Sequence, residues 1–176
     1  MSKSASEHKS KAPSRVNFAL ITVSTSRYYE LQAGRHVNNP SGDLIIKLFN
    51  GTGNEVVYND LVPDDMNLIR KSIEKTTNMS SIDAIIICGG TGVTRTDITI
   101  ETVTPLMEKQ LPGFGEIFRK LSYESIGSAA IITRASAGLI NGKIVFCLPG
   151  SLQAVEMAMK NLIIPEVAHI VKHVRE

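Results

Sequence analysis

A short glycine-rich loop followed by an aspartate has the clearest chemical potential in this sequence. The loop, residues 89–92, comes directly after an apolar run, and Asp97 lies between it and a helix predicted to begin at Thr99. Glycine lets backbone N–H groups approach an anion closely, and the helix adds the positive end of its dipole. A carboxylate beside an anion is unfavourable unless a cation lies between them. The spacing therefore favours a phosphate and Mg²⁺ site over an ordinary glycine turn.

Two familiar nucleotide-binding loops do not match the residues around these glycines. A Walker A loop needs a lysine and then a serine or threonine, whereas Gly92 is followed by Val93, Thr94 and Arg95. The Rossmann fingerprint needs glycines spaced as GxGxxG, whereas residues 89–92 read GGTG. The sequence therefore does not predict a P-loop NTPase, and it lacks the Rossmann fingerprint.

A second candidate carboxylate, Asp64, follows a proline after a short predicted strand. Asp64 or its neighbour Asp65 could cap the helix expected over Met66–Thr76, because an aspartate oxygen accepts hydrogen bonds from the first turn of a helix. The cap is the role that the residues alone favour for Asp64. The alternative is a second acidic group at the site near Asp97.

Four serines could act as nucleophiles on paper, but no elbow motif frames any of them and no histidine is placed by sequence as a base. Hydrogen bonding to a ligand is the expected role. These serines are Ser24, Ser41, Ser136 and Ser151.

Two histidines, His169 and His173, lie one helical turn apart, which is the spacing of metal ligands on a helix. No glutamate follows His169, and no third ligand is evident. We expect this pair to lie on a solvated or interface face.

Hydrophobic patterning predicts strands that alternate with helices. Strands are expected at residues 16–24, 55–58, 85–87 and 143–148, with a long polar loop at 25–40 and a turn at 112–115. Helices are expected from Ser41, over 66–76, 99–109 and 116–123, and over 152–162 and 166–174. Residues 128–133 fit either state. The order predicts an α/β three-layer sandwich with a mostly parallel, Rossmann-like central sheet, whose strand ends bring Ser24, the glycine loop and Ser151 together.

Composition indicates one globular domain with no polyanionic partner. The 176 residues are 43% hydrophobic with a net charge of +2, so nucleic acid binding is not indicated. Residues 1–14 are expected to form a flexible tail and residues 15–176 the domain. Apolar stretches are too short for a membrane span. Cys88 and Cys147 each follow an apolar run and are expected to be buried, reduced thiols of a cytoplasmic protein.

Three segments together carry a resemblance to a known family. GGTGVTRTDITIE from Gly89, PGFGEIFR from Pro112 and LPGS from Leu148, in this order and spacing, resemble the molybdopterin adenylyltransferase family, which includes MogA, MoaB and the G domain of gephyrin. The similarity covers residues 16–176. The MoaB branch is the most similar, because the chain ends soon after LPGS and its helices.

The resemblance implies a trimeric or hexameric protein that uses Mg²⁺ and ATP to adenylylate molybdopterin, releases pyrophosphate and hands the product to a molybdenum-insertion protein. It assigns catalysis and Mg²⁺ binding to Asp64 and Asp97. The expected substrate and phosphate contacts are Ser24, Ser41, Gly89, Gly90, Thr91, Gly92, Ser136, Pro149, Gly150 and Ser151.

The rival hypothesis is a non-catalytic molybdopterin carrier or scaffold. Asp64 discriminates between the two, because binding alone does not require a second carboxylate. Two departures from the family pattern, Thr25 and Asn39, stand where the family often has aspartates, which affects the substrate contacts expected in the first loop.

Overall fold

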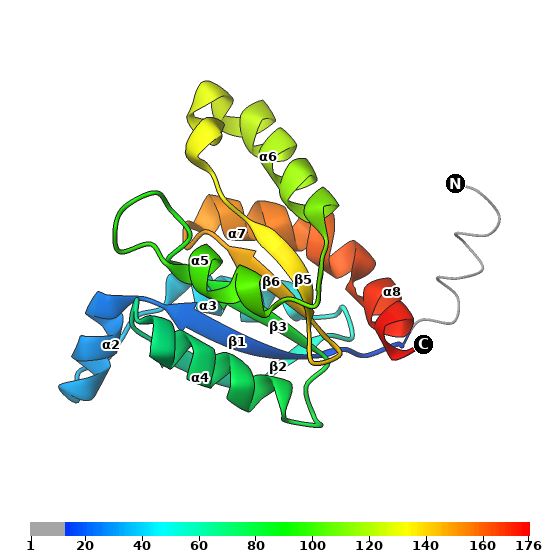
Figure 1. Ribbon diagram of the computed structural model, residues 1–176, viewed down its shortest axis with the longest axis horizontal. Helices are drawn as coiled ribbons and strands as arrows, with labels where there is room; N and C mark the ends of the chain where they lie inside the picture. Colours follow the sequence, from blue (N-terminus) through cyan, green and yellow to red (C-terminus); the bar gives the residue numbers. More distant parts are fainter. Residues whose placement is uncertain (1–12) are drawn as a thin grey trace.

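A twisted six-stranded sheet forms the centre of the computed structural model, which describes residues 13–176 (Figure 1). The strand order is β2-β1-β3-β6-β5-β4, in which β2, β1, β3 and β6 run parallel, and β5 pairs antiparallel with both β6 and β4. The strands are β1 (Asn17–Val23), β2 (Glu55–Val62), β3 (Ala84–Cys88), β4 (Lys109–Gln110), β5 (Ser136–Ile140) and β6 (Lys143–Leu148). All but the last two residues of the predicted tail lie outside the described residues.

Helices cover both faces of this sheet and make the fold a three-layer sandwich, as predicted. One hydrophobic cluster joins the sheet to α3 (Pro40–Phe49), α7 (Leu152–Ala158) and α8 (Ile164–Arg175), and the other joins it to α4 (Met66–Thr77) and α5 (Thr99–Val103). Every residue of β3 is buried, because this strand lies in the middle of the sheet with helices on both faces. The continuous apolar run that predicted this strand is the sequence signature of such double burial.

The first connection differs from its prediction as a long loop. Residues Thr25–Gln32 form α2, which projects from the body of the molecule (Figure 1). None of its residues is buried, so it has no apolar stripe for hydrophobic periodicity to detect. The next helix, α3, is capped by Asn39, whose side chain accepts from the Gly42 N–H, and not by Ser41, because Pro40 occupies the first helical position.

Two further boundaries were predicted wrongly, and proline explains both. The helix expected over 99–109 ends at Val103 and continues as a 3-10 turn, Thr104–Leu106, because Pro105 lacks the N–H that an α-helix requires. The turn expected at 112–115 is instead the first turn of α6 (Pro112–Ile126), with Pro112 at its favoured initial position. Helix α6 and the 3-10 segment η2 (Gly127–Ile132) form an arm that rises above the sheet (Figure 1).

The C-terminal helices form a continuous stretch and not two helices. A π-helical segment, Met159–Ile163, joins α7 to α8 and accommodates Pro165. The predicted hairpin turn is confirmed at Asn141, which has a φ of 49°, followed by Gly142 with a φ of 67°. Both cysteines are buried, and they do not form a disulfide bond with each other. Within residues 13–176, we find no helix with the length and hydropathy needed to cross a membrane.

Candidate functional site

The glycine loop lies where the parallel strands end, as the sequence predicts. Gly89 and Gly90 have φ values of 109° and 61°, which side chains rarely adopt. A Cβ at Gly89 would collide with the Val23 carbonyl of the neighbouring strand, and one at Gly90 would lie 2.7 Å from Oδ1 of Asp64. Only glycine allows the loop to pass this close to β1 and to the carboxylate.

All four carbonyl groups of the loop accept hydrogen bonds from two residues outside it. The Thr99 hydroxyl donates to the Gly89 carbonyl at 2.8 Å, and the Thr99 N–H donates to the Gly90 carbonyl at 2.9 Å. Arg134 donates from Nε to the Thr91 carbonyl at 2.8 Å and from Nη2 to the Gly92 carbonyl. Because a peptide C=O and N–H point in opposite directions, these bonds fix the directions of the loop N–H groups as well.

The N–H groups at the two ends of the loop already have protein partners. Gly89 N–H donates to the Leu148 carbonyl at 3.0 Å, and Gly92 N–H hydrogen-bonds the Asp97 carboxylate. Of the loop N–H groups predicted to bind an anion, those of Gly90 and Thr91, in the middle of the loop, therefore have no such partner assigned.

Besides the bond from the Gly92 N–H, Asp97 accepts two hydrogen bonds from Thr94. Its Oδ2 accepts from the Thr94 N–H at 2.9 Å and from the Thr94 hydroxyl at 2.5 Å. The Thr94 hydroxyl, together with N–H groups of the loop and the positive charge of Arg134, lowers the pKa of Asp97 below its ordinary value, because all of them favour the charged form. Asp97 is therefore an oriented, ionised carboxylate at neutral pH.

Asp64 is held in the same way by Thr25, the first residue of α2. Asp64 Oδ2 accepts from the Thr25 hydroxyl at 2.7 Å and from the Thr25 N–H at 3.2 Å, and the Asp64 N–H donates back to the hydroxyl at 3.0 Å. The helix cap is Asp65, whose Oδ1 accepts from the N–H groups of Asn67 and Leu68 at 2.9 Å each. The capping role considered for Asp64 is thus filled by its neighbour, and Asp64 Oδ1 faces the glycine loop.

The predicted serines have different positions. Ser41 donates to the Gly150 carbonyl at 2.6 Å and so links α3 to the segment after β6. Ser151 caps α7 by accepting from the Ala154 N–H at 3.3 Å. Ser24 follows β1 directly, and its hydroxyl lies 3.4 Å from that of Ser26. The structure therefore brings these serines to the same edge of the sheet as the loop and gives two of them structural partners.

Ser136 lies apart from this group. It begins β5, pairs across the ladder with Cys147 and lines a separate pocket with residues of α6 such as Gly115 and Arg119. A Cβ at Gly115 would lie 2.7 Å from the Ala135 carbonyl, so α6 packs closely against this strand. The geometry does not bring Ser136 together with the glycine loop.

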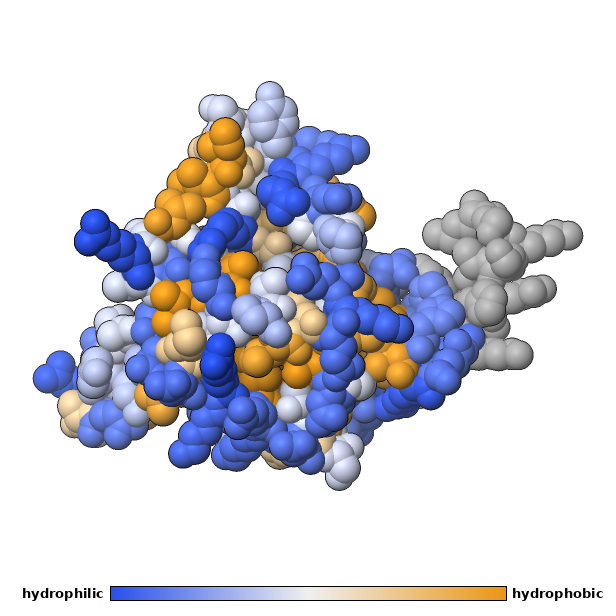
Figure 2. Space-filling view, in the orientation of Figure 1, coloured by the Kyte–Doolittle hydropathy of each residue, from blue (hydrophilic) through white to orange (hydrophobic). Residues whose placement is uncertain are grey.

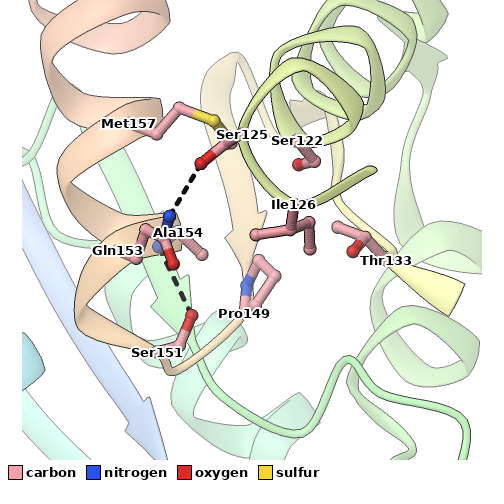
Figure 3. Close-up of a pocket in the computed structure, with 9 residues that line it drawn as sticks. All are labelled: Ser122, Ser125, Ile126, Thr133, Pro149, Ser151, Gln153, Ala154 and Met157. Carbon is pink, nitrogen blue, oxygen red and sulfur yellow. Dashed lines mark hydrogen bonds between the residues drawn. The ribbon is translucent and has the colours of Figure 1, made fainter. Parts of the chain in front are cut away.

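Two adjoining pockets flank the segment after β6. The first, of about 310 Å³, lies against the loop and is lined by Gly90, Thr91, Gly92, Asp97, Ile132, Thr133, Arg134, Pro149 and Gly150. The second, of about 90 Å³, shares Thr133 and Pro149 with the first and lies between the α6–η2 arm and α7 (Figure 3). Figure 3 shows Ile126 and Met157 beside hydroxyl groups, and the Gln153 amide donating to Ser125 at 2.7 Å. The arrangement joins the pocket beside the glycine loop to a part-apolar recess.

Sequence reasoning missed Thr25, Thr94, Thr99 and Arg134 as parts of this site. Thr94 and Thr99 lie beside Asp97, so their hydroxyls were available as a local signal. Thr25 and Arg134 act across 39 and 43 residues of chain, and no local pattern could have indicated those pairings.

Comparisons with known proteins agree with the fold and identify a family. The family model described as a probable molybdopterin binding domain matches residues 19–169. Molybdenum cofactor biosynthesis protein B of Bacillus subtilis is 44% identical over 174 residues, covering 98% of each chain. Molybdopterin adenylyltransferase of Pyrococcus furiosus is 43% identical, covering 97% of this chain and 98% of that protein.

Solved structures give the same result. A crystal structure of molybdenum cofactor biosynthesis protein B superposes with a TM-score of 0.85 at 38% identity, covering 94% of this chain and 99% of the other. The glycine loop, its two oriented aspartates and all of the sheet except the first two residues of β1 lie within residues 19–169, which the family model matches. The chain is therefore a member of the molybdenum cofactor biosynthesis family that is defined by the probable molybdopterin binding domain.

Proposed function

We propose that this protein is a molybdopterin adenylyltransferase, which transfers the adenylyl group of ATP to the terminal phosphate of molybdopterin and releases pyrophosphate. The observation that carries the proposal is the pair of aspartates, Asp64 and Asp97, each held by a threonine beside the glycine loop. The two relatives above support it, because one of them bears the name of this activity and matches nearly the whole chain. In the reaction, a phosphate oxygen of molybdopterin attacks the α-phosphorus of ATP, and the bond to pyrophosphate breaks.

The donor atoms at this site suit Mg²⁺. Asp64 and Asp97 offer carboxylate oxygens, and no sulfur or imidazole ligand accompanies them in the contacts described above. Among residues 13–176, no group of three or more acidic, histidine or cysteine side chains forms a complete metal cage. Mg²⁺ is commonly bound by one or two carboxylates together with water and substrate phosphates, so two aspartates are sufficient. Bound there, the ion would neutralise charge on the phosphates.

The chain's own residues account for much of the positioning. The N–H groups of Gly90 and Thr91, with directions fixed through the bonds of Thr99 to the Gly89 and Gly90 carbonyls, would bind phosphate oxygens in the pocket beside Asp97. Adenylyl transfer brings several negative charges together, so most of the catalysis must come from positioning and charge neutralisation. Because these hydrogen-bond donors are held in place before substrate arrives, they reduce the free-energy cost of bringing the charged groups together.

The decisive experiment is incubation with ATP, Mg²⁺ and molybdopterin, followed by detection of adenylyl-molybdopterin and pyrophosphate. Asp97→Asn keeps the shape of the side chain but removes its charge. It should lower the transfer rate by at least about a hundredfold while molybdopterin binding persists. Binding without any product from the wild type would instead support the carrier hypothesis.

We also propose that the chain assembles as a homotrimer or homohexamer. The α6–η2 arm carries exposed apolar side chains on its outer surface (Figure 2). They are Ile117, Tyr123, Ile126, Ile131 and Ile132, of which Ile131 is 88% exposed. Figure 2 shows an apolar patch over part of this arm, and such a patch is typical of a surface that is covered by another protein. A monomeric mass at micromolar concentration in light scattering would contradict this proposal.

A further inference from the structure

Two histidines near the end of α8 face each other through their Nε2 atoms. His169 and His173 lie one helical turn apart, and their Nε2 atoms are 2.9 Å from each other. The rings are steeply inclined, with centroids 4.7 Å apart and an interplanar angle of 62°. Both Nε2 atoms are therefore directed at one point beside the helix.

A carboxylate lies on the opposite side of each ring. Nδ1 of His169 is 3.3 Å from Oε2 of Glu166, and Nδ1 of His173 is 3.0 Å from Oε2 of Glu176. A carboxylate oxygen accepts hydrogen bonds, so each Nδ1 is assigned as the N–H donor. In a neutral imidazole with a protonated Nδ1, the Nε2 atom carries a lone pair. Two such lone pairs can share one proton, which accounts for the hydrogen-bonding distance between the Nε2 atoms, and a metal ion would take the place of that proton.

The distance between the Nε2 atoms is close to what a shared metal ion requires. Zn²⁺ binds imidazole nitrogen at about 2.0–2.1 Å, so two such ligands at a tetrahedral angle lie roughly 3.4 Å apart. A small rotation of either ring closes the difference. Metal-binding histidines also commonly donate their other N–H to a carboxylate, which fixes the tautomer and makes the ligand nitrogen more basic. Glu166 and Glu176 are placed to do this.

We propose that His169 and His173 bind a divalent transition metal ion, such as Zn²⁺, Ni²⁺ or Cu²⁺, through their Nε2 atoms. Glu166 and Glu176 orient the two rings, and water completes the coordination. The site lies in the last turns of α8, where the negative end of the helix dipole attracts cations. Lys172 brings a positive charge near the site, but its Nζ lies 3.6 Å from the Glu176 carboxylate, which offsets that charge.

This site is separate from the loop that binds phosphate in the proposed reaction. The end of α8 is attached at the opposite ends of the strands, because Arg175 pairs with Asp83 immediately before β3 begins. The two sites also differ in chemistry: imidazole nitrogen selects zinc, nickel and copper, whereas Mg²⁺ prefers oxygen ligands. Millimolar Mg²⁺ should therefore not displace a metal ion from the histidines.

The test is titration of the full-length, untagged chain with Zn²⁺ and with Ni²⁺ by calorimetry, in buffer containing Mg²⁺. The wild type should bind one ion per chain, and His173→Gln should weaken binding at least tenfold. The double variant Glu166→Gln, Glu176→Gln should weaken it about ten- to hundredfold with both imidazoles still present. His36→Gln is the matched control, because His36 is exposed and lies in the loop before α3.

A second readout identifies the ligands directly. Cu²⁺ bound to the wild type should show two nitrogen ligands in its electron paramagnetic resonance spectrum, and His169→Gln should leave one. Adenylyl transfer should stay at the wild-type rate in these variants. The proposal is overturned if the wild type takes up no Zn²⁺ or Ni²⁺, which would mean that only a proton lies between the rings. It is also overturned if removing both histidines leaves the metal affinity unchanged.

Discussion

The Thr25 hydroxyl and the Asp64 carboxylate form a reciprocal pair, in which the hydroxyl donates to Oδ2 and accepts from the Asp64 N–H. This pair joins the first turn of α2 to the end of β2 and leaves Asp64 Oδ1 facing Gly90. In the same way, the N–H and the hydroxyl of Thr94 both donate hydrogen bonds to the Asp97 carboxylate. The glycine loop thus lies beside two carboxylates whose directions are set before any ligand binds.

We predict that Thr25→Val lowers adenylyl transfer by about ten- to hundredfold, because valine keeps the shape of the side chain but cannot orient Asp64. Thr25→Ser should retain most of the activity, since the hydroxyl remains. The rates should be measured by pyrophosphate release at saturating ATP across a range of Mg²⁺ concentrations. Equal rates for the valine and serine variants would show that the hydroxyl has no part in positioning Asp64.

Neighbouring substitutions at Asp64 and Asp65 should separate chemistry from stability. Asp65→Ala removes the cap of α4 and should lower the free energy of unfolding by about 1 kcal/mol with little effect on the transfer rate. Asp64→Asn should have the opposite profile, with a normal melting temperature, normal molybdopterin affinity and weakened Mg²⁺-dependent use of ATP. Wild-type turnover by Asp64→Asn would favour the carrier hypothesis.

The lowered pKa of Asp97 predicts a dependence of stability on pH. An aspartate with a folded-state pKa below its unfolded value stabilises the fold above about pH 4, and this stabilisation is lost as the pH falls through the folded pKa. Thr94→Val removes the largest cause of the shift and should therefore destabilise the protein more at pH 7 than at about pH 3. Urea unfolding at both pH values measures this. If Thr94→Val lowers the free energy of unfolding equally at both pH values, Thr94 is not the cause of the lowered pKa of Asp97.

The four parallel strands could be predicted because they have local causes, whereas β4 and β5 were not predicted. Ile85, Ile86 and Ile87 are fully buried, and an uninterrupted β-branched run between turn residues is typical of a strand covered on both faces. Helix α2 could not be predicted in the same way, because none of its residues is buried and its sequence therefore carries no periodic apolar pattern. Its position instead follows from Thr25, whose partner is in another part of the chain.

The sequence indicated the glycine loop and the two aspartates that the structure brings beside it, but not the contacts that hold them. Adjacent aspartates in LVPDD have the same capping chemistry, and only the fold shows that Asp65 turns to the helix while Asp64 turns to Thr25. The loop glycines were evident from sequence, whereas the residue that binds two of the loop carbonyls, Arg134, is distant in the chain. Pairings of this kind depend on tertiary structure and leave no local pattern.

Burial should make both thiols unreactive in the folded protein. Removal from water raises the pKa of Cys88 and of Cys147 to about 12, so at pH 8 only about one thiol in ten thousand is ionised. We expect no reaction with a thiol reagent over several minutes at pH 8 in native conditions. The same chain in concentrated urea should react at two thiols. Rapid labelling of the native chain would show that the sheet opens or that a thiol is accessible.

Arg134 provides the sharpest test of how the loop is organised. Its guanidinium donates to the carbonyls of Thr91 and Gly92 and pairs with Glu101, and these contacts need the planar set of donors that lysine lacks. Arg134→Lys keeps the positive charge but should release at least one loop carbonyl, which can then turn towards the phosphate pocket and repel the ligand. We expect the KM for ATP to rise about tenfold or more, with a similar rise in Arg134→Gln.

Glu101→Gln is the matched control, because it weakens the ion pair but leaves the carbonyl contacts, and its KM should stay within about twofold of wild type. If Arg134→Lys binds ATP as the wild type does while Arg134→Gln does not, the charge of Arg134 matters and its hold on the loop carbonyls does not.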